Sequence, residues 1–246
     1  MVECEGGTRW VHGRDRRPAW SHFGDVSECY NNFAWRARGH GYADTVIKEG
    51  WRLFEEHTQL AKQTLTAAKK LNAQCPFWWG SMQLVALAEG WNLASYDKPF
   101  SEAVTFEPAC VIFYRYKVNF LMPRWFGKEG DWQKFAAQSA DKTGGEAGDI
   151  LYARIGWRVH NLGYYTGFQR DSGYSWPRMK KGLEAITRQY PQSLTAASEL
   201  AFLTYQANDR AGAKPIFERI GTNVDKEVWH DDKPRFTRAR TWAFSE

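Results

Sequence analysis

The sequence predicts an all-α protein, and three observations support this fold class. Apolar residues recur at the three- and four-residue spacing of one helix face through most of the chain. Nowhere do apolar and polar residues alternate for long enough to indicate a half-buried strand. Prolines and glycines divide the periodic stretches into segments of helix length. With 246 residues, 43% of them apolar, the chain can bury a continuous core.

The two ends of the chain differ from its middle. Residues 1–42 have little periodicity and contain six glycines, so we expect an irregular N-terminal arm with a short helix at about 26–37. A helical-repeat domain is predicted at 43–225. Residues 226–246 are expected to form a basic C-terminal tail. Towards its end this tail has a run of basic residues with no acidic residue between them, Lys233, Arg235, Arg238 and Arg240.

The segment that begins at Thr45 is predicted to be a long amphipathic helix that ends near Asn72, ahead of Pro76. The apolar residues on one of its faces are Trp51, Phe54, Ala61, Leu65 and Ala68. Glu55 and Glu56 lie on its other faces, where we expect surface ion pairs. Further helices are predicted at 77–90, 96–107, 109–121, 131–141, 149–162, 176–190, 193–206 and 210–220.

The connections between these helices contain recognisable start and stop signals. The stretch 123–132 is an elaborated turn, in which Pro123 and the glycines end one helix. Asp131 is expected to cap the next helix, because its side-chain oxygen can accept hydrogen bonds from unpaired backbone N–H groups. Asp149 is expected to do the same for the helix at 149–162. A longer insertion is predicted at 163–173.

The helices recur in pairs. Pro76 and Pro108 each follow a helix with a complete apolar face, and they lie 32 positions apart, which is a typical period of a helix-turn-helix repeat. The 83 positions from Pro108 to Pro191 fit two further pairs with insertions. Because one pair cannot bury its apolar stripe alone, neighbouring pairs stack and share a core. We therefore predict a right-handed α-solenoid of about five helix pairs.

This spacing resembles the tetratricopeptide repeat. The matching small, aromatic and proline positions are Ala201, Tyr205, Ala213 and Phe217, with Phe100, Ala103 and Pro108 in an earlier pair. Three segments also resemble an uncharacterised bacterial tetratricopeptide-like family of unknown function. They are Trp35-Arg36-Ala37-Arg38-Gly39, Gly50-Trp51-Arg52-Leu53-Phe54, and Pro123-Arg124-Trp125-Phe126-Gly127 followed by Gly130-Asp131-Trp132. The resemblance spans about 35–229 and implies an α-solenoid of bacterial origin, but no activity.

Charge and aromatic content indicate the kind of partner. The chain carries a formal net charge of +5, and its 13 tryptophans exceed what ordinary helix packing requires. These features favour a partner of acidic character. The charge falls short of the strongly basic surface that is typical of a nucleic-acid-binding domain. Binding of single-stranded nucleic acid through the basic ends and exposed tryptophans is therefore a second alternative only.

No motif indicates catalysis, a metal or a cofactor. The four cysteines form no CxxC pair, and the six histidines form no HExxH motif. The glycine clusters lack the pattern of a phosphate-binding loop. We therefore predict a protein that is not an enzyme, with reduced thiols and no small-molecule substrate. No signal sequence or membrane-spanning run is present, so we expect a cytoplasmic protein, or one whose signal sequence has been removed.

The predicted function is the binding of a protein or peptide. The first helix of each pair commonly lines the concave side of such solenoids. The aromatic and arginine residues expected there are Trp78, Trp79, Tyr114, Arg115, Arg154, Trp157 and Arg158. Indoles supply apolar anchors, and guanidinium groups pair with carboxylates. The alternative for the rings is a place in the core. The alternative for the function is an immunity-type protein that neutralises a bacterial toxin.

Overall fold

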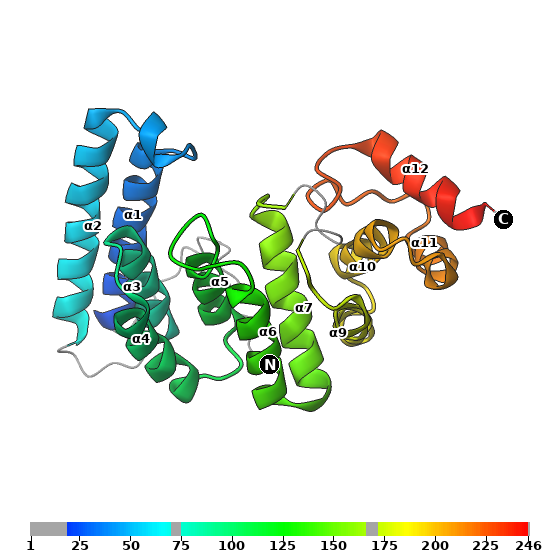
Figure 1. Ribbon diagram of the computed structural model, residues 1–246, viewed down its shortest axis with the longest axis horizontal. Coiled ribbons are helices and arrows are strands. Elements are labelled where there is room, and N and C mark those ends of the chain that lie inside the picture. Colours follow the sequence, from blue (N-terminus) through cyan, green and yellow to red (C-terminus); the bar gives the residue numbers. More distant parts are fainter. Residues whose placement is uncertain (1–18, 70–74, 166–171, 246) are drawn as a thin grey trace. The chain divides into compact units, whose positions relative to one another are not determined.

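The computed structural model describes residues 19–69, 75–165 and 172–245, and the regular structure in these ranges is helical, without a strand. The all-α class is therefore confirmed. The chain divides into two compact units, residues 1–128 and 129–246, and Figure 1 labels their helices. None of the helices within the described ranges combines the length and the apolar character that a membrane span needs.

The first unit is built on a long helical hairpin. Its elements are α1 (Ala19–Arg38), the 3-10 helix η1 (Ala43–Thr45), α2 (Lys48–Lys69), α3 (Pro76–Ala88), α4 (Leu93–Phe106) and α5 (Val111–Phe120). Helices α1 and α2 lie side by side (Figure 1), and α3 packs against both of them. Helices α4 and α5 in turn pack against α3 and against each other.

Helix α2 buries the apolar face that the sequence predicts except for Trp51, which is exposed. Its buried residues are Gly50, Phe54, Thr58, Ala61, Leu65 and Ala68. Ala61 and Leu65 meet Met82 and Val85 of α3 in a cluster that is closed to water. Because these positions repeat every three or four residues, the whole length of α2 is held against its neighbours.

Residues 121–127 fold back against the end of α5 in a compact turn. The backbone N–H of Trp125 donates a hydrogen bond to the carbonyl oxygen of Met122 over 2.8 Å. A Cβ atom at Gly127 would lie 1.9 Å from the carbonyl oxygen of Leu121. Only glycine allows the backbone to pass this close. The turn therefore fixes the place from which the Trp125 ring projects.

The second unit is a series of helices in which each described helix contacts the next. Its elements are α6 (Asp131–Thr143), α7 (Gly145–Asn161), α9 (Trp176–Gln189), α10 (Leu194–Gln206), η2 (Arg210–Gly212), α11 (Ala213–Ile220) and α12 (Lys233–Phe244). Trp132 and Trp229 are both 0% exposed and are the largest side chains of its core. The predicted insertion at 163–173 lies partly outside the described residues.

Two predicted helix caps are wrong. Helix α6 begins at Asp131 with Gly130 as its N-cap. The carboxylate of Asp131 therefore lies in the first turn, where its negative charge still stabilises the helix by interacting with the positive end of the helix dipole. Helix α7 begins at Gly145, because Gly144 and Gly145 have φ angles of +73° and +55° that reverse the chain directly after α6. Asp149 lies inside α7, where it accepts a hydrogen bond from a side chain of α9.

Both ends of the chain contain more helix than the sequence predicts. The short helix expected at 26–37 is part of α1, which begins at Ala19. Residues 1–18 of the predicted arm lie outside the described residues. Residues 233–244 of the predicted tail form α12, which Asp232 caps and which buries Phe236. Basic residues lie between the apolar positions of α12, so the sequence shows no clear apolar periodicity there. The predicted boundaries of arm, repeat domain and tail stay predictions.

Replacing Trp132 by alanine should lower the free energy of unfolding by about 3 kcal/mol or more. The ring is fully buried, and its indole N–H donates to the hydroxyl of Tyr165 over 2.8 Å. The change removes apolar contacts and the hydrogen bond between the indole and this hydroxyl. Urea denaturation followed by circular dichroism measures the effect. Trp132→Phe keeps most of the ring and should cost less than half as much; a loss below about 0.5 kcal/mol in Trp132→Ala would contradict the prediction.

Candidate functional site

Aromatic rings gather around one arginine in the first unit. Arg38 is the last residue of α1, and Trp35 precedes it by one helical turn. Trp51 comes from the first turn of α2, and Trp125 comes from the turn after α5. Three segments that are far apart in the sequence therefore meet at this point. We call Trp35, Arg38, Trp51, Phe54 and Trp125 the Arg38 cluster.

The guanidinium group of Arg38 lies within cation–π distance of three indoles. Its central carbon is 5.8 Å from the ring centroid of Trp35, 5.6 Å from that of Trp51 and 5.2 Å from that of Trp125. The rings also contact one another edge to face. The centroids of Trp35 and Trp125 are 5.5 Å apart at an interplanar angle of 87°. This arrangement places the positive edges of some rings against the negative faces of others.

Arg38 also binds the connection between α1 and α2. Its Nη1 donates to the carbonyl oxygens of Gly39 over 3.3 Å and Gly41 over 3.0 Å. Burial lowers the pKa of the Arg38 guanidinium, and the nearby positive charge of Arg124 lowers it further. In the described part of the chain, neither Arg38 nor Arg124 has a carboxylate partner. The cluster is thus a site of uncompensated positive charge.

The cluster brings together residues from each of the three segments on which the predicted resemblance rests. Trp35 and Arg38 come from the first segment, Trp51 and Phe54 from the second, and Trp125 from the third, where it follows Arg124. Sequence reasoning did not place these residues together, because each segment is more readily explained as the end of its own helix. The signal that would have indicated the site is the recurrence of tryptophan beside arginine in all three.

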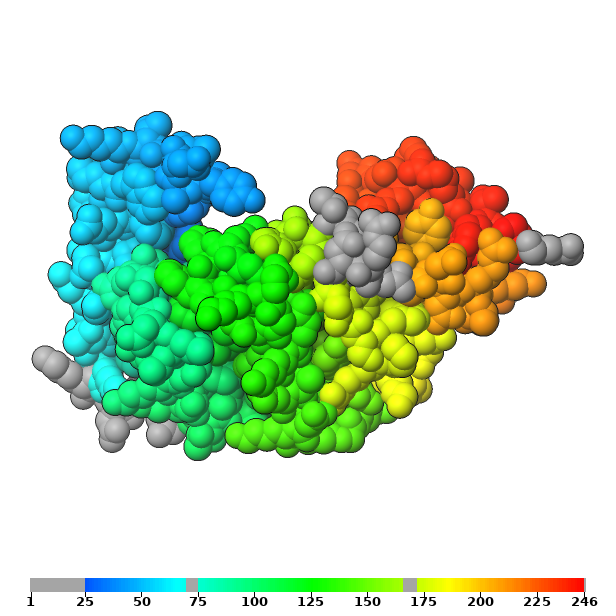
Figure 2. All heavy atoms as spheres, viewed as in Figure 1, coloured from blue at the N-terminus to red at the C-terminus, as the bar shows by residue number. Residues whose placement is uncertain are grey.

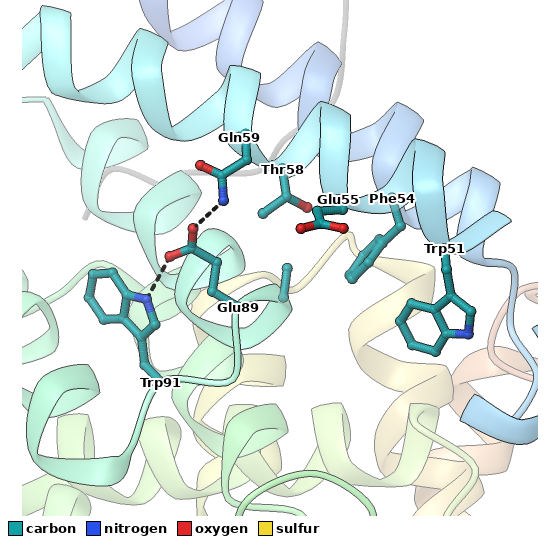
Figure 3. Close-up of a pocket in the computed structure, with 8 residues that line it drawn as sticks. Trp51, Phe54, Glu55, Thr58, Gln59, Glu89 and Trp91 are labelled. Carbon is teal, nitrogen blue, oxygen red and sulfur yellow. Dashed lines mark hydrogen bonds between the residues drawn. The ribbon is translucent and has the colours of Figure 1, made fainter. Parts of the chain in front are cut away.

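A pocket of about 510 Å³ lies beside the cluster, and Trp51 and Phe54 belong to both. One face of α2 forms one wall, and the end of α3 with the turn that follows it forms the other (Figure 3). The residues that line it are Trp51, Phe54, Glu55, Thr58, Gln59, Ala88, Glu89 and Trp91. We call this cavity the Trp51 pocket. Sequence reasoning missed it, because it treated Trp51 and Phe54 only as the buried face of α2.

Three donors hold the carboxylate of Glu89 at one end of the Trp51 pocket. Gln59 Nε2 donates over 2.9 Å and the indole N–H of Trp91 over 2.8 Å (Figure 3), and Lys62 Nζ donates over 2.8 Å. Burial of this carboxyl raises its pKa, but the donors outweigh burial, with Lys62 contributing most, so the pKa of Glu89 lies below its ordinary value. Glu89 is therefore an anion at neutral pH.

The structure separates the residues predicted to bind a partner into two groups, one in each unit. In the first unit the indole N–H of Trp78 donates to the carbonyl oxygen of Leu65 over 2.7 Å. Trp79 is half-buried and packs against Phe106 and Phe113. Tyr114 is 7% exposed and donates to a backbone carbonyl, whereas Arg115 is exposed. Most of these rings therefore take part in packing.

The other predicted residues, Arg154, Trp157 and Arg158, are half-buried on α7. The ring of Trp157 stacks on His160 with centroids 5.2 Å apart, and His160 contacts Phe202 and His230. Burial lowers the pKa of His160 to about 4, with further contributions from His230 and Arg235. In the ranges that the structure describes, no group of three or more His, Cys, Asp or Glu side chains is arranged to hold a metal ion.

Replacing Arg38 by methionine should lower the free energy of unfolding by roughly 2 kcal/mol, because the thioether fills part of the space but loses the cation–π contacts and the two bonds to carbonyl oxygens. Urea denaturation followed by tryptophan fluorescence measures the loss. Arg36→Met is the matched control, since Arg36 is exposed on the same helix and should change stability little. Equal effects of the two substitutions would show that Arg38 does not organise the cluster.

Lowering the pH from 7 to 5 should destabilise the protein by roughly 2 kcal/mol more than it destabilises the variant His160→Gln. In the unfolded chain the histidine has its ordinary pKa of 6.5, whereas in the folded protein the value is about 4. The contribution of neutral His160 is therefore fully present above pH 6.5 and is lost as the pH falls towards 4. Urea denaturation at both pH values tests this, and equal pH dependence in the two proteins would refute it.

Comparisons of this chain with protein-family models, with curated proteins and with solved structures find no match. The resemblance to tetratricopeptide-like proteins accordingly stays a prediction, and the function has to be argued from the Arg38 cluster and the Trp51 pocket.

Proposed function

We propose that this protein is a binding module that takes an acidic segment of a partner protein on the surface around the Arg38 cluster. The observation that carries this proposal is the pair Arg38 and Arg124. Their charges are close enough to affect each other, and in the described part of the chain neither has a carboxylate partner. A carboxylate from outside would relieve their repulsion and accept several N–H donors at once.

The surroundings of this arginine pair supply apolar anchors. Trp51 is 37% exposed, and Tyr42 and Ile47 are 75% and 73% exposed in the connection that Arg38 binds. In the space-filling view this connection lies on the surface of the first unit (Figure 2). Exposed aromatic side chains beside arginine are typical of the residues that dominate binding energy in protein interfaces.

The chemistry of the surface favours binding over catalysis. Guanidinium groups keep their protons near neutral pH, so Arg38 and Arg124 offer positive charge and hydrogen-bond donors but no general base. The indole N–H groups of Trp35 and Trp125 are buried and have no acceptor among the described residues. The arginine pair thus suits a bound anion and offers no side chain that exchanges a proton near neutral pH.

The proposal includes the solenoid arrangement that the repeat period predicts. Within the first unit, α3 contacts both α1 and α2, and α5 contacts α3 as well as α4. Within the second unit, α10 contacts α12 as well as α11. Contacts between a helix and its second neighbour are characteristic of stacked helix pairs. They support helix-pair packing inside each unit, and about five pairs in the chain remain our proposal.

Charge reversal of Arg124 should weaken binding of an acidic peptide roughly tenfold or more. Peptides are selected from a random display library against the immobilised protein, synthesised with a fluorescent label and titrated by anisotropy. We expect the enriched peptides to combine Asp or Glu with apolar residues. Arg115→Glu is the matched control, because it makes the same change at an exposed arginine among the sequence-predicted residues of the same unit.

Three outcomes would contradict this assignment. Loss of binding in Arg115→Glu with full binding in Arg124→Glu would move the partner to the residues around Trp79 and Tyr114. Enrichment of neutral or basic peptides would show that the positive charges of Arg38 and Arg124 do not select the partner. Tighter binding of labelled single-stranded RNA than of any selected peptide, with a steep loss of affinity as salt rises, would favour the nucleic-acid alternative.

A further inference from the structure

The Trp51 pocket differs in chemistry from the Arg38 cluster beside it. Its lining contains two carboxylates, Glu55 and Glu89, and no basic side chain. Lys62 reaches Glu89 from outside the lining and offsets one of the two negative charges. The pocket therefore keeps about one negative charge, although the chain as a whole carries +5. Local charge of this kind selects a ligand at short range, where screening by salt is weakest.

Glu55 is the carboxylate that remains available. Its neighbours on α2 are engaged, since Arg52 binds Glu49 over 2.7 Å and Glu56 over 2.8 Å. In the described part of the chain, Glu55 itself has no hydrogen-bond or ion-pair partner. The sequence predicts surface ion pairs for both Glu55 and Glu56, but among the residues that the structure describes only Glu56 forms one. Glu55 instead lines the pocket between Trp51 and Thr58 (Figure 3).

A buried hydroxyl gives the lining a second acceptor. Thr58 is 3% exposed, and its Oγ1 has no hydrogen-bond partner among the described residues. A buried polar atom without a partner costs free energy, which a donor on a ligand would recover. A hydroxyl oxygen can accept from an ammonium or guanidinium N–H. Glu55 and Thr58 lie on the same face of α2, one helical turn apart.

The remaining lining is aromatic and apolar. Trp51 and Trp91 stand at the two ends of the row of side chains in Figure 3, and Phe54 lies between them. Indole rings attract cations as well as apolar groups. Arg38 and Lys62 already lie near these two rings, at 5.6 Å and 6.0 Å from their centroids. The rings alone would therefore select a cation weakly, and the carboxylate of Glu55 provides the main selectivity.

We infer that the Trp51 pocket binds an organic cation that carries a guanidinium or alkylammonium group. The charged group would lie against Glu55 and donate to Thr58, and its alkyl part would contact Trp51 and Phe54. A volume of about 510 Å³ is within the range of small-molecule sites, and it also admits the side chain of an arginine or lysine. This inference is independent of the proposed acidic partner, because it uses different charged residues.

Calorimetric titration with butylguanidinium and with butylurea tests the inference. The two probes have nearly the same shape, but only the first is charged. We expect butylguanidinium to bind and butylurea to bind at least about tenfold more weakly. Glu55→Gln should weaken butylguanidinium roughly tenfold, whereas Glu56→Gln on the same helix should have no effect. Both glutamates are exposed, so neither substitution should disturb folding.

A second pair of probes distinguishes the two sources of such a cation. Titration with a capped Ala-Arg-Ala peptide, with Ala-citrulline-Ala as its neutral counterpart, reports on a peptide side chain. Tighter binding of the arginine peptide than of butylguanidinium supports a peptide as the source, and the reverse order supports a free small molecule. Equal affinity for charged and neutral probes, absence of binding, or an unchanged affinity in Glu55→Gln would overturn the inference.

The design also separates this inference from the proposed function. Arg124→Glu should weaken binding of the acidic peptide and leave the affinity for butylguanidinium unchanged. Glu55→Gln should weaken binding of butylguanidinium and leave the affinity for the acidic peptide unchanged. If both substitutions weakened both ligands equally, the two surfaces would be one site and the assignment of the cation to the Trp51 pocket would be wrong.

Discussion

The first unit depends on the contact between one guanidinium group and three indoles. Arg38 joins the end of α1, the start of α2 and the turn after α5, and it also binds the backbone at Gly39 and Gly41. A cation can hold several rings at once because its charge attracts each ring whose negative face lies within about 6 Å of it. A carboxylate partner would compete with the rings for the same guanidinium. The absence of such a partner in the described chain is therefore part of how the cluster forms.

This contact also determines the properties of the surface next to it. Trp51 contacts Arg38 and also lines the Trp51 pocket, which contains the carboxylates of Glu55 and Glu89. The position of Trp51 is fixed by α2, whose buried face repeats from Phe54 to Ala68. One aromatic side chain therefore belongs both to a group of residues around a positive charge and to a pocket lined by carboxylates. The two proposed sites, one for an anion and one for a cation, share this ring.

The sequence predicts the helices of this protein better than it predicts the sites. Apolar periodicity located α2 and α9, since it follows directly from which face is buried. It did not reveal α12, whose apolar positions lie among basic residues, or the start of α7, which two glycines with positive φ decide. The Arg38 cluster depends on three segments approaching in space, and local spacing carries no information about such an approach. Trp79 is a further example. The sequence placed it on a binding surface, whereas it packs against Phe113, because aromatic residues occur both in helix cores and in binding grooves.

The excess positive charge of the chain is partly structural. Lys117 is 3% exposed, lies 4.7 Å from the ring centroid of Tyr96 and pairs with Asp97; burial lowers its pKa, which Asp97 opposes. In the second unit Arg235 of α12 lies 4.6 Å from the ring centroid of Phe202. Basic side chains of this kind hold helices together and contribute little to a long-range field. The formal charge of +5 therefore does not show where an anion would bind. The proposed recognition of an acidic partner depends instead on a local pair of arginines, Arg38 and Arg124.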